Sequence, residues 1–255
     1  MGMPKPRGAV TGSQLKMVAV VAMLIDHTAY LLLGCKVLSA LPASAAGYAG
    51  YIQVYRVMRC VGRAAFPIYA FLLTEGIVHT RDWKKYGLRL GVFALVSEIP
   101  FDLLCFQQLV SWERQNVFFT LLLGLLAVEG AEYAAGRASR AQSYPGEKSS
   151  LAWIVAAGIG CQAAVFLRTD YDAGGVLLVV LLYLLRQSRL RQCVAGFLWL
   201  LVTEARWYYA AGLAAAFLLI GMYNGERGRQ RGKYAFYAFY PLHLAVLYLI
   251  YCYLP

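Results

Sequence analysis

Long apolar runs separated by short polar segments recur along almost the whole chain. A helix needs about 20 mostly apolar residues to cross the hydrocarbon core of a bilayer, and its backbone groups must be hydrogen-bonded within the segment. The pattern therefore predicts an all-α, polytopic integral membrane protein. About nine transmembrane helices are expected, at residues 14–34, 60–79, 86–106, 116–134, 151–167, 173–186, 192–204, 207–223 and 234–254.

The polar segments are too short to form a second domain. We therefore expect residues 1–255 to form a single transmembrane domain, with a short basic tail at 1–13 and one long polar loop at 136–150. Composition agrees, because 60% of the residues are hydrophobic and 15% are charged, whereas soluble domains are about 25% charged. The boundaries of the spans between residues 173 and 204 are the least defined.

The basic residues indicate how the chain is oriented. A formal net charge of +11 would suggest nucleic acid as the partner of a soluble protein. Here Lys and Arg lie in short segments between spans, which predicts membrane lipid and no nucleic acid as partner. Sixteen fall in segments on the same side as the N-terminus and six on the other, namely Lys36, Arg56, Arg59, Arg114, Arg168 and Arg206. Cytoplasmic segments are the basic ones, so the N-terminus is predicted to be cytoplasmic.

The six cysteines are scattered, without a CxxC pair or a histidine at ligand spacing. No metal site and no disulfide framework is predicted from such a pattern.

Several ionisable residues fall inside the predicted spans. Each charged side chain at mid-membrane costs at least about 2.5–3.5 kcal/mol, so it is kept where it pairs or lines a wet cavity. A group at one level in the outer half comprises Asp26, His27, Arg59, Arg63, Glu98 and Asp102, together with Gln115 and Asn116 at the start of the fourth span and Asp170 and Asp172 in the loop before the sixth. Glu75 and His79 lie toward the inner end of their span, and His243 lies near the middle of the last. Pro67, Pro100 and Pro241 are each expected to interrupt a helix near such a charge.

Spacing suggests how four of these charges are compensated. Arg59 and Arg63 are four residues apart on one helix, and Glu98 and Asp102 are four apart on the next. Residues with this spacing share a helix face, so two cross-helix ion pairs are the simplest arrangement. The four residues then form either an electrostatic latch or part of a substrate-binding site, and the sequence leaves both open.

His27 is the strongest candidate for chemistry. A histidine titrates near neutrality and can take a proton from a nucleophile and return it to a leaving group. Asp26 points about 100° away around the helix, so a carboxylate from helix 86–106 is the better candidate to orient the imidazole. The alternative is a hydrogen bond that serves only helix packing.

His243 follows Pro241 by two residues in the run from Phe239. It is interpreted either as a second catalytic or binding group facing the same cavity, or as a polar contact beside the kink.

Several blocks of this chain, in this order, resemble the TraX family of membrane proteins. The blocks are Met23–His27, Arg59–Pro67 continuing to Glu75 and Gly76, Ser97–Asp102, Gln115–Thr120 and Tyr240–His243. The resemblance covers nearly the whole chain. It implies an inner-membrane protein of the kind typified by the conjugation pilin acetylase, which acetylates the amino terminus of pilin, and a distant similarity to transmembrane acyltransferases.

The resemblance implies acetyl-CoA as acyl donor, no metal, and a pilin-like peptide or small molecule as acceptor. His27 is then expected to act as general base or transient acyl carrier, with Asp26 and His243 as the other catalytic candidates. The expected substrate-binding or polar scaffold consists of Arg59, Arg63, Glu75, Glu98, Asp102, Asn116 and Asp170. Asn116 is also a candidate oxyanion donor.

Two other classes of function fit the intramembrane charges. A proton-coupled secondary transporter also uses membrane-embedded Asp, Glu and His, but the paired repeats common in transporters are not visible here. A non-catalytic assembly factor would use the same charges as latches.

Overall fold

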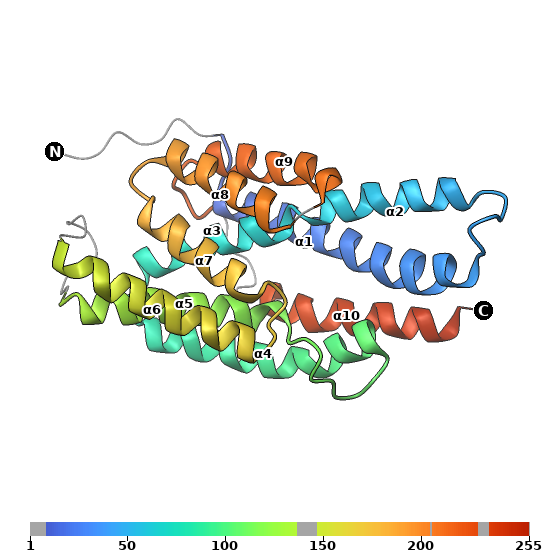
Figure 1. Cartoon of the computed structure of the whole chain (residues 1–255), viewed down its shortest axis with the longest axis horizontal. Helices are drawn as coiled ribbons and strands as arrows, with labels where there is room; N and C mark the ends of the chain where they lie inside the picture. The colour runs from blue at the N-terminus through green and yellow to red at the C-terminus, as the bar shows by residue number, and fades with distance from the viewer. Residues whose placement is uncertain (1–8, 137–146, 205, 229–234, 255) are drawn as a thin grey trace. The chain divides into compact units, whose positions relative to one another are not determined.

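The structure is a computed structural model that describes residues 9–136, 147–204, 206–228 and 235–254. Within these ranges the regular structure is helical, which confirms the all-α prediction. The helices are α1 (Gly12–Thr28), η1 (Ala29–Leu38), α2 (Tyr48–Gly62), α3 (Ala65–His79), α4 (Trp83–Phe106), α5 (Val117–Ala134), α6 (Glu147–Phe166), α7 (Asp172–Leu184), α8 (Arg189–Thr203), η2 (Trp207–Tyr209), α9 (Ala210–Gly221) and α10 (Ala235–Tyr253) (Figure 1). Most of the predicted basic tail and loop, at 1–8 and 137–146, lie outside the described residues.

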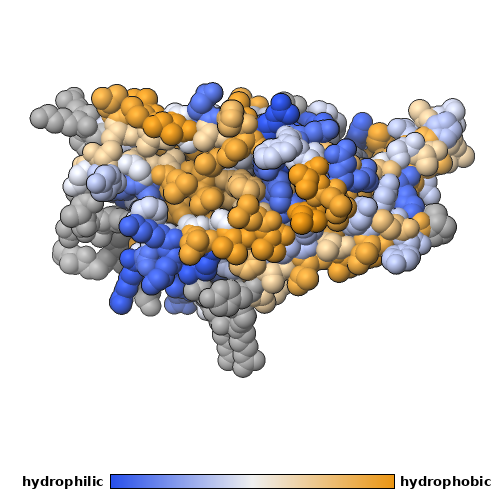
Figure 2. Space-filling view, turned by 90° about the horizontal axis from the view of Figure 1, so that it is seen from below, coloured by the Kyte–Doolittle hydropathy of each residue, from blue (hydrophilic) through white to orange (hydrophobic). Residues whose placement is uncertain are grey.

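Four segments of the described chain are long and apolar enough to cross a membrane. They are Gly12–Leu38, Tyr48–His79, Val117–Ala134 and Ala235–Tyr253. Shorter apolar helices occupy Ser150–Phe166, Asp172–Leu184 and Trp207–Gly221. Large apolar side chains are exposed along the helices, and apolar residues spread over the face seen in Figure 2. The protein is therefore a multi-pass membrane protein, while nine spans and a cytoplasmic N-terminus stay predictions.

The second span begins earlier than the apolar pattern indicated. The pattern placed its start at residue 60, but α2 is helical from Tyr48. Gln53, Arg56 and Arg59 divide this stretch of α2, so it does not form a long apolar run. The helix packs against α1, η1 and α9, while apolar side chains such as Val54 and Val57 are exposed.

Two of the three prolines lie inside helices that continue through them, so the predicted interruption is not seen at these two positions. Pro100 lies within α4 and Pro241 within α10. Pro67 is different, because it stands in the first turn of α3, where the missing N–H would have had no helical partner. The preceding helix α2 ends at Gly62, and Arg63 and Ala64 form a turn before α3 begins.

The first span changes its winding just after the histidine of interest. At Ala29 the α-helix continues as the π-helix η1, and π-helical turns are rare and frequent at functional sites. Near its end, Lys36 Nζ donates hydrogen bonds to the carbonyl oxygens of Tyr251, at 2.9 Å, and of Leu254. These carbonyls belong to the last turn of α10 and the residue after it, so Lys36 caps that helix.

The chain divides into two compact units. Unit 1 consists of residues 1–69, 100–109 and 193–255, and unit 2 of residues 70–99 and 110–192. In unit 1, α1, η1, α2, α9 and α10 pack together; in unit 2, α5, α6 and α7 form a closely packed group. A Cβ at Gly124 would meet the side chain of Val179 at 2.9 Å, so this glycine lets α5 and α7 approach closely, as small residues do between membrane helices.

Candidate functional site

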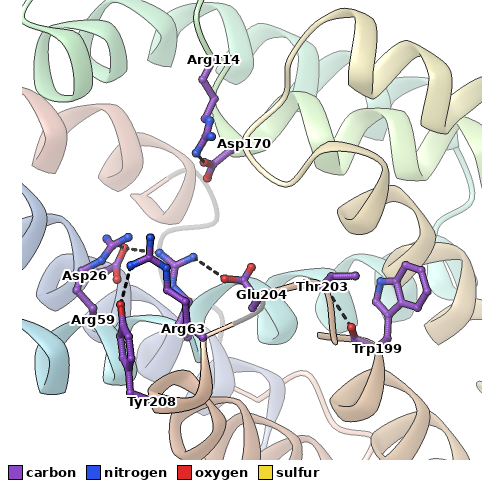
Figure 3. Close-up of polar contacts among 10 residues, drawn as sticks. Asp26, Arg59, Arg63, Arg114, Asp170, Trp199, Thr203, Glu204 and Tyr208 are labelled. Carbon is purple, nitrogen blue, oxygen red and sulfur yellow. Dashed lines mark hydrogen bonds and ion pairs between the residues drawn. The ribbon is translucent and has the colours of Figure 1, made fainter. Parts of the chain in front are cut away.

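Asp26 on α1 lies at the centre of an ionic cluster in unit 1. Its Oδ2 accepts hydrogen bonds from Arg59 Nη1 at 2.6 Å and from Arg63 Nη2 at 3.3 Å. Arg63 Nη1 also lies 3.4 Å from Glu204 Oε2, just after α8 (Figure 3). The four side chains are only 12–16% exposed. Two guanidinium groups and two carboxylates therefore compensate one another where solvent is largely excluded.

The backbone of α2 is shaped to receive Asp26. A Cβ on Gly62 would overlap the Asp26 carboxyl group, so only glycine lets the two helices meet at this level. The guanidinium carbons lie over aromatic rings, Arg59 5.6 Å from the centroid of Tyr30 and Arg63 4.9 Å from that of Tyr209. Such cation–π contacts strengthen when desolvated, which fixes both side chains in place.

This arrangement corrects the predicted pairing of Arg59. Its carboxylate partner is Asp26, not a residue of helix 86–106. Asp26, predicted from the sequence to be catalytic, pairs with Arg59 and Arg63, and its catalytic role stays a prediction. Glu204 was missed, because an acid at the end of a predicted span is usually a solvated residue.

His27 and His243 form a hydrogen-bonded pair in the same unit. His27 Nδ1 lies 2.8 Å from His243 Nε2, and His243 Nδ1 lies 2.8 Å from the carbonyl oxygen of Phe239. A carbonyl oxygen only accepts, so His243 carries its proton on Nδ1 and, when neutral, accepts at Nε2. His27 must then donate from Nδ1. The lone pair of the neutral His27 ring is therefore on Nε2.

Aromatic packing holds His243 in this orientation. Phe239 stacks on its ring with centroids 4.8 Å apart and planes 8° from parallel, and Tyr240 contacts the rings of both histidines edge-on. His243 is 5% exposed, whereas His27 is half-buried. The prediction that a carboxylate of helix 86–106 orients His27 is thus wrong, because the orienting group is His243 on α10. His243 thus contacts the candidate base directly, and both interpretations of its role stay predictions.

Asn116 occupies a capping position in unit 2. Its Oδ1 accepts from the backbone N–H of Phe118 at 3.1 Å, which caps α5. Its Nδ2 donates to the carbonyl of Ala94 at 2.8 Å and to Glu98 Oε2, and the residue is fully buried. Both amide hydrogens are used in these contacts, which argues against the predicted oxyanion role.

The remaining predicted residues are distributed between the units. In unit 2, Glu75 Oε1 lies 3.5 Å from Arg189, and Asp170 Oδ1 lies 3.7 Å from Arg114 in a half-exposed pair. Asp102, in the unit 1 part of α4, is 1% exposed. The predicted set thus separates into a cluster around Asp26, His27 and His243 in unit 1 and distinct polar contacts in unit 2.

Comparison with known proteins identifies the family. The family model described as TraX protein matches residues 11–251. The chain belongs to the TraX family. This membership confirms the resemblance inferred from the sequence. The chain is 30% identical over 254 residues to the "Probable fimbrial assembly protein FimC, serogroup H1" of Dichelobacter nodosus, covering 92% of this chain and 93% of the relative. No solved structure matches the chain.

Proposed function

We propose that this TraX-family protein is an integral membrane acyltransferase of the bacterial cytoplasmic membrane. It moves an acetyl group from acetyl-CoA to an amine or hydroxyl at the outer side. The observation that carries the proposal is the His27–His243 pair, because it leaves the base nitrogen of a membrane-embedded histidine in a fixed tautomer. The relative's name, a fimbrial assembly protein, supports a pilin-like peptide as acceptor.

The proposed reaction is a direct transfer. His27 Nε2 takes a proton from the attacking nitrogen or oxygen as this atom bonds to the thioester carbonyl carbon. The carbon–sulfur bond then breaks, the sulfur leaves with the bonding electrons, and the His27 imidazolium protonates it to give free CoA thiol. The positive charge that His27 carries between these steps is shared through Nδ1–H with His243, whose Nε2 accepts.

The ionic cluster positions the base. Asp26 precedes His27 on α1, so the salt bridges to Arg59 and Arg63 fix the helical turn that carries His27. A catalytic group must be held to within a fraction of an ångström for efficient transfer. Arg59, Arg63 and Glu204 are therefore assigned as positioning residues and not as acid–base groups.

The acyl donor is expected to approach from the cytoplasmic side. The turn before α4 and the first turn of that helix present the exposed cations Arg81, Lys84 and Lys85, which suit the phosphates of a CoA thioester. Lys85 also contacts Asp82, and its backbone N–H and ammonium group hold the pKa of that carboxyl below its usual value. The donor itself is inferred from the family resemblance.

Transfer of labelled acetyl by the purified protein in nanodiscs tests the proposal. Wild type would be compared with His27→Ala, while product label, protein-bound label and thioester hydrolysis are followed. We expect transfer to fall about 10²–10⁴-fold in the variant, which is the usual contribution of a general base. His79→Ala is the matched control, because His79 is exposed and its Nδ1 is hydrogen-bonded to the Glu75 carbonyl of its own helix. A folded wild type that neither binds nor consumes acetyl-CoA would overturn the proposal and favour the transporter.

A further inference from the structure

Two further arginines of unit 1 meet at one tyrosine. Arg56 lies on α2 one turn before Arg59, and its guanidinium carbon is 5.9 Å from the centroid of the Tyr208 ring. Arg206 Nη1 donates a hydrogen bond to the Tyr208 hydroxyl at 2.8 Å. The elements concerned pack together, because α2 contacts η2. Figure 3 shows Tyr208 pointing toward the cluster of Asp26, Arg59 and Arg63.

The two pairs of arginines differ in how their charge is compensated. Arg59 and Arg63 have carboxylate partners in Asp26 and Glu204. Among the described residues, Arg56 and Arg206 contact no carboxylate, and the aromatic side chain of Tyr208 is the group they share. The hydrogen bond to Tyr208 raises the pKa of Arg206 further above its usual value, so this guanidinium stays charged.

Two uncompensated guanidinium groups around one phenol favour an anion. Guanidinium groups bind carboxylates and phosphates through paired, charge-assisted hydrogen bonds. Arg56 is half-buried and Arg206 is exposed, so an anion can reach both without the burial of a new charge. The pair therefore differs from Arg59 and Arg63, whose carboxylate partners Asp26 and Glu204 lie within the chain.

We propose that Arg56, Arg206 and Tyr208 bind an anionic group that the acceptor carries close to its nucleophile. The preferred acceptor is then an amine or hydroxyl compound with a neighbouring carboxylate or phosphate. With the N-terminus cytoplasmic, α2 runs inward from the outer side, so Arg56 lies on the outer side of Arg59, where the acceptor and not CoA would enter. This inference rests on the proposed function for the identity of the ligand as acceptor.

Binding is tested directly, without acetyl transfer. The probes are two tripeptide amides with free amino termini, Ala-Glu-Ala and Ala-Gln-Ala, which differ in one charge. Trp207 is 82% exposed beside Arg206, so its fluorescence reports occupancy, and Trp207→Phe identifies its share of the signal. We expect wild type in phosphatidylcholine nanodiscs to bind the glutamyl peptide about tenfold more tightly, the size of one charge-assisted contact.

The double variant Arg56→Gln with Arg206→Gln should lower this preference to about one. Arg191→Gln is the control. It removes one positive charge from an exposed side chain in the first turn of α8, away from Arg206 in the sequence, and should keep the preference. Equal binding of both peptides by wild type would overturn the inference. If adding phosphatidylglycerol abolishes the preference, Arg56 and Arg206 bind a lipid headgroup, and this result would also overturn the inference.

These outcomes are separate from those of the proposed function. Acetyl-CoA hydrolysis without added acceptor should be equal in wild type and in the double variant, because the pair binds the acceptor. A selective loss of acetyl-CoA binding in the double variant would place the donor's phosphates there and contradict the inference. If the protein distinguishes the two peptides but does not turn over acetyl-CoA, the anion site would stand and the proposed acyltransferase function would be wrong.

Discussion

His27 and His243 are 216 positions apart in the sequence, yet Nδ1 of the first lies 2.8 Å from Nε2 of the second. The carbonyl of Phe239 fixes the proton of His243 on Nδ1, and this in turn fixes the proton of His27. One backbone carbonyl on α10 therefore decides which nitrogen of a side chain on α1 is available as a base.

The role of His243 can be separated from simple packing by two substitutions. His243→Gln keeps an oxygen that can accept from His27 Nδ1–H, whereas His243→Phe fills the space without an acceptor. We expect kcat for acetyl transfer to fall about 10²-fold in the phenylalanine variant and much less in the glutamine variant, with KM for acetyl-CoA unchanged in both. Steady-state kinetics in nanodiscs measures both constants. Equal rates in the two variants would contradict the proposal that His243 shares the positive charge of His27.

Asp26 should be essential for the stability of unit 1. Asp26→Asn leaves Arg59 without its carboxylate partner, and removing one member of a buried ion pair costs about 3–5 kcal/mol. We expect unfolding in detergent to shift by about that free energy. Glu204→Gln removes a single 3.4 Å contact and should have a smaller effect. If the two variants are equally stable, Asp26 is not the centre of the cluster.

Asn116→Ala distinguishes capping from catalysis. Loss of the cap on α5 should destabilise the protein by about 1 kcal/mol, while the folded fraction keeps its rate of acetyl transfer. Thermal unfolding and activity per folded protein would be measured on the same sample. A rate loss of about 10²–10³-fold at unchanged stability is the signature of an oxyanion donor and would restore the role inferred from the sequence.

The predicted orientation places the end of α10 outside the cell membrane. Cys252 is the exposed cysteine of the described chain, so a membrane-impermeant maleimide should label it in spheroplasts without lysis. Lys84→Cys in a Cys252→Ser background provides the opposite case, because residue 84 is exposed in the first turn of α4, on the predicted cytoplasmic side, and should be labelled only after lysis. The reverse labelling pattern would invert the topology and exchange the sides assigned to donor and acceptor.

The membrane class and the helical content follow from the sequence alone. Apolar runs of span length have no stable alternative to helices in lipid, and all nine predicted ranges contain helix. The same reasoning located Asp26, His27, Arg59 and Arg63 as unusual charges, because an ionisable residue in an apolar run is costly wherever the helix lies. It failed for residues 48–59, because Gln53, Arg56 and Arg59 divide the apolar pattern of a segment that is nevertheless helical.

The partners of these charges were decided by the tertiary structure. Helical periodicity states which residues share a face of one helix, but it carries no information about which helix packs against that face. Gly62 lets α1 approach α2 at the level of Asp26, and this contact gives Arg59 its carboxylate. In the same way, the position of α10 beside α1 makes His243, and not a carboxylate, the partner of His27.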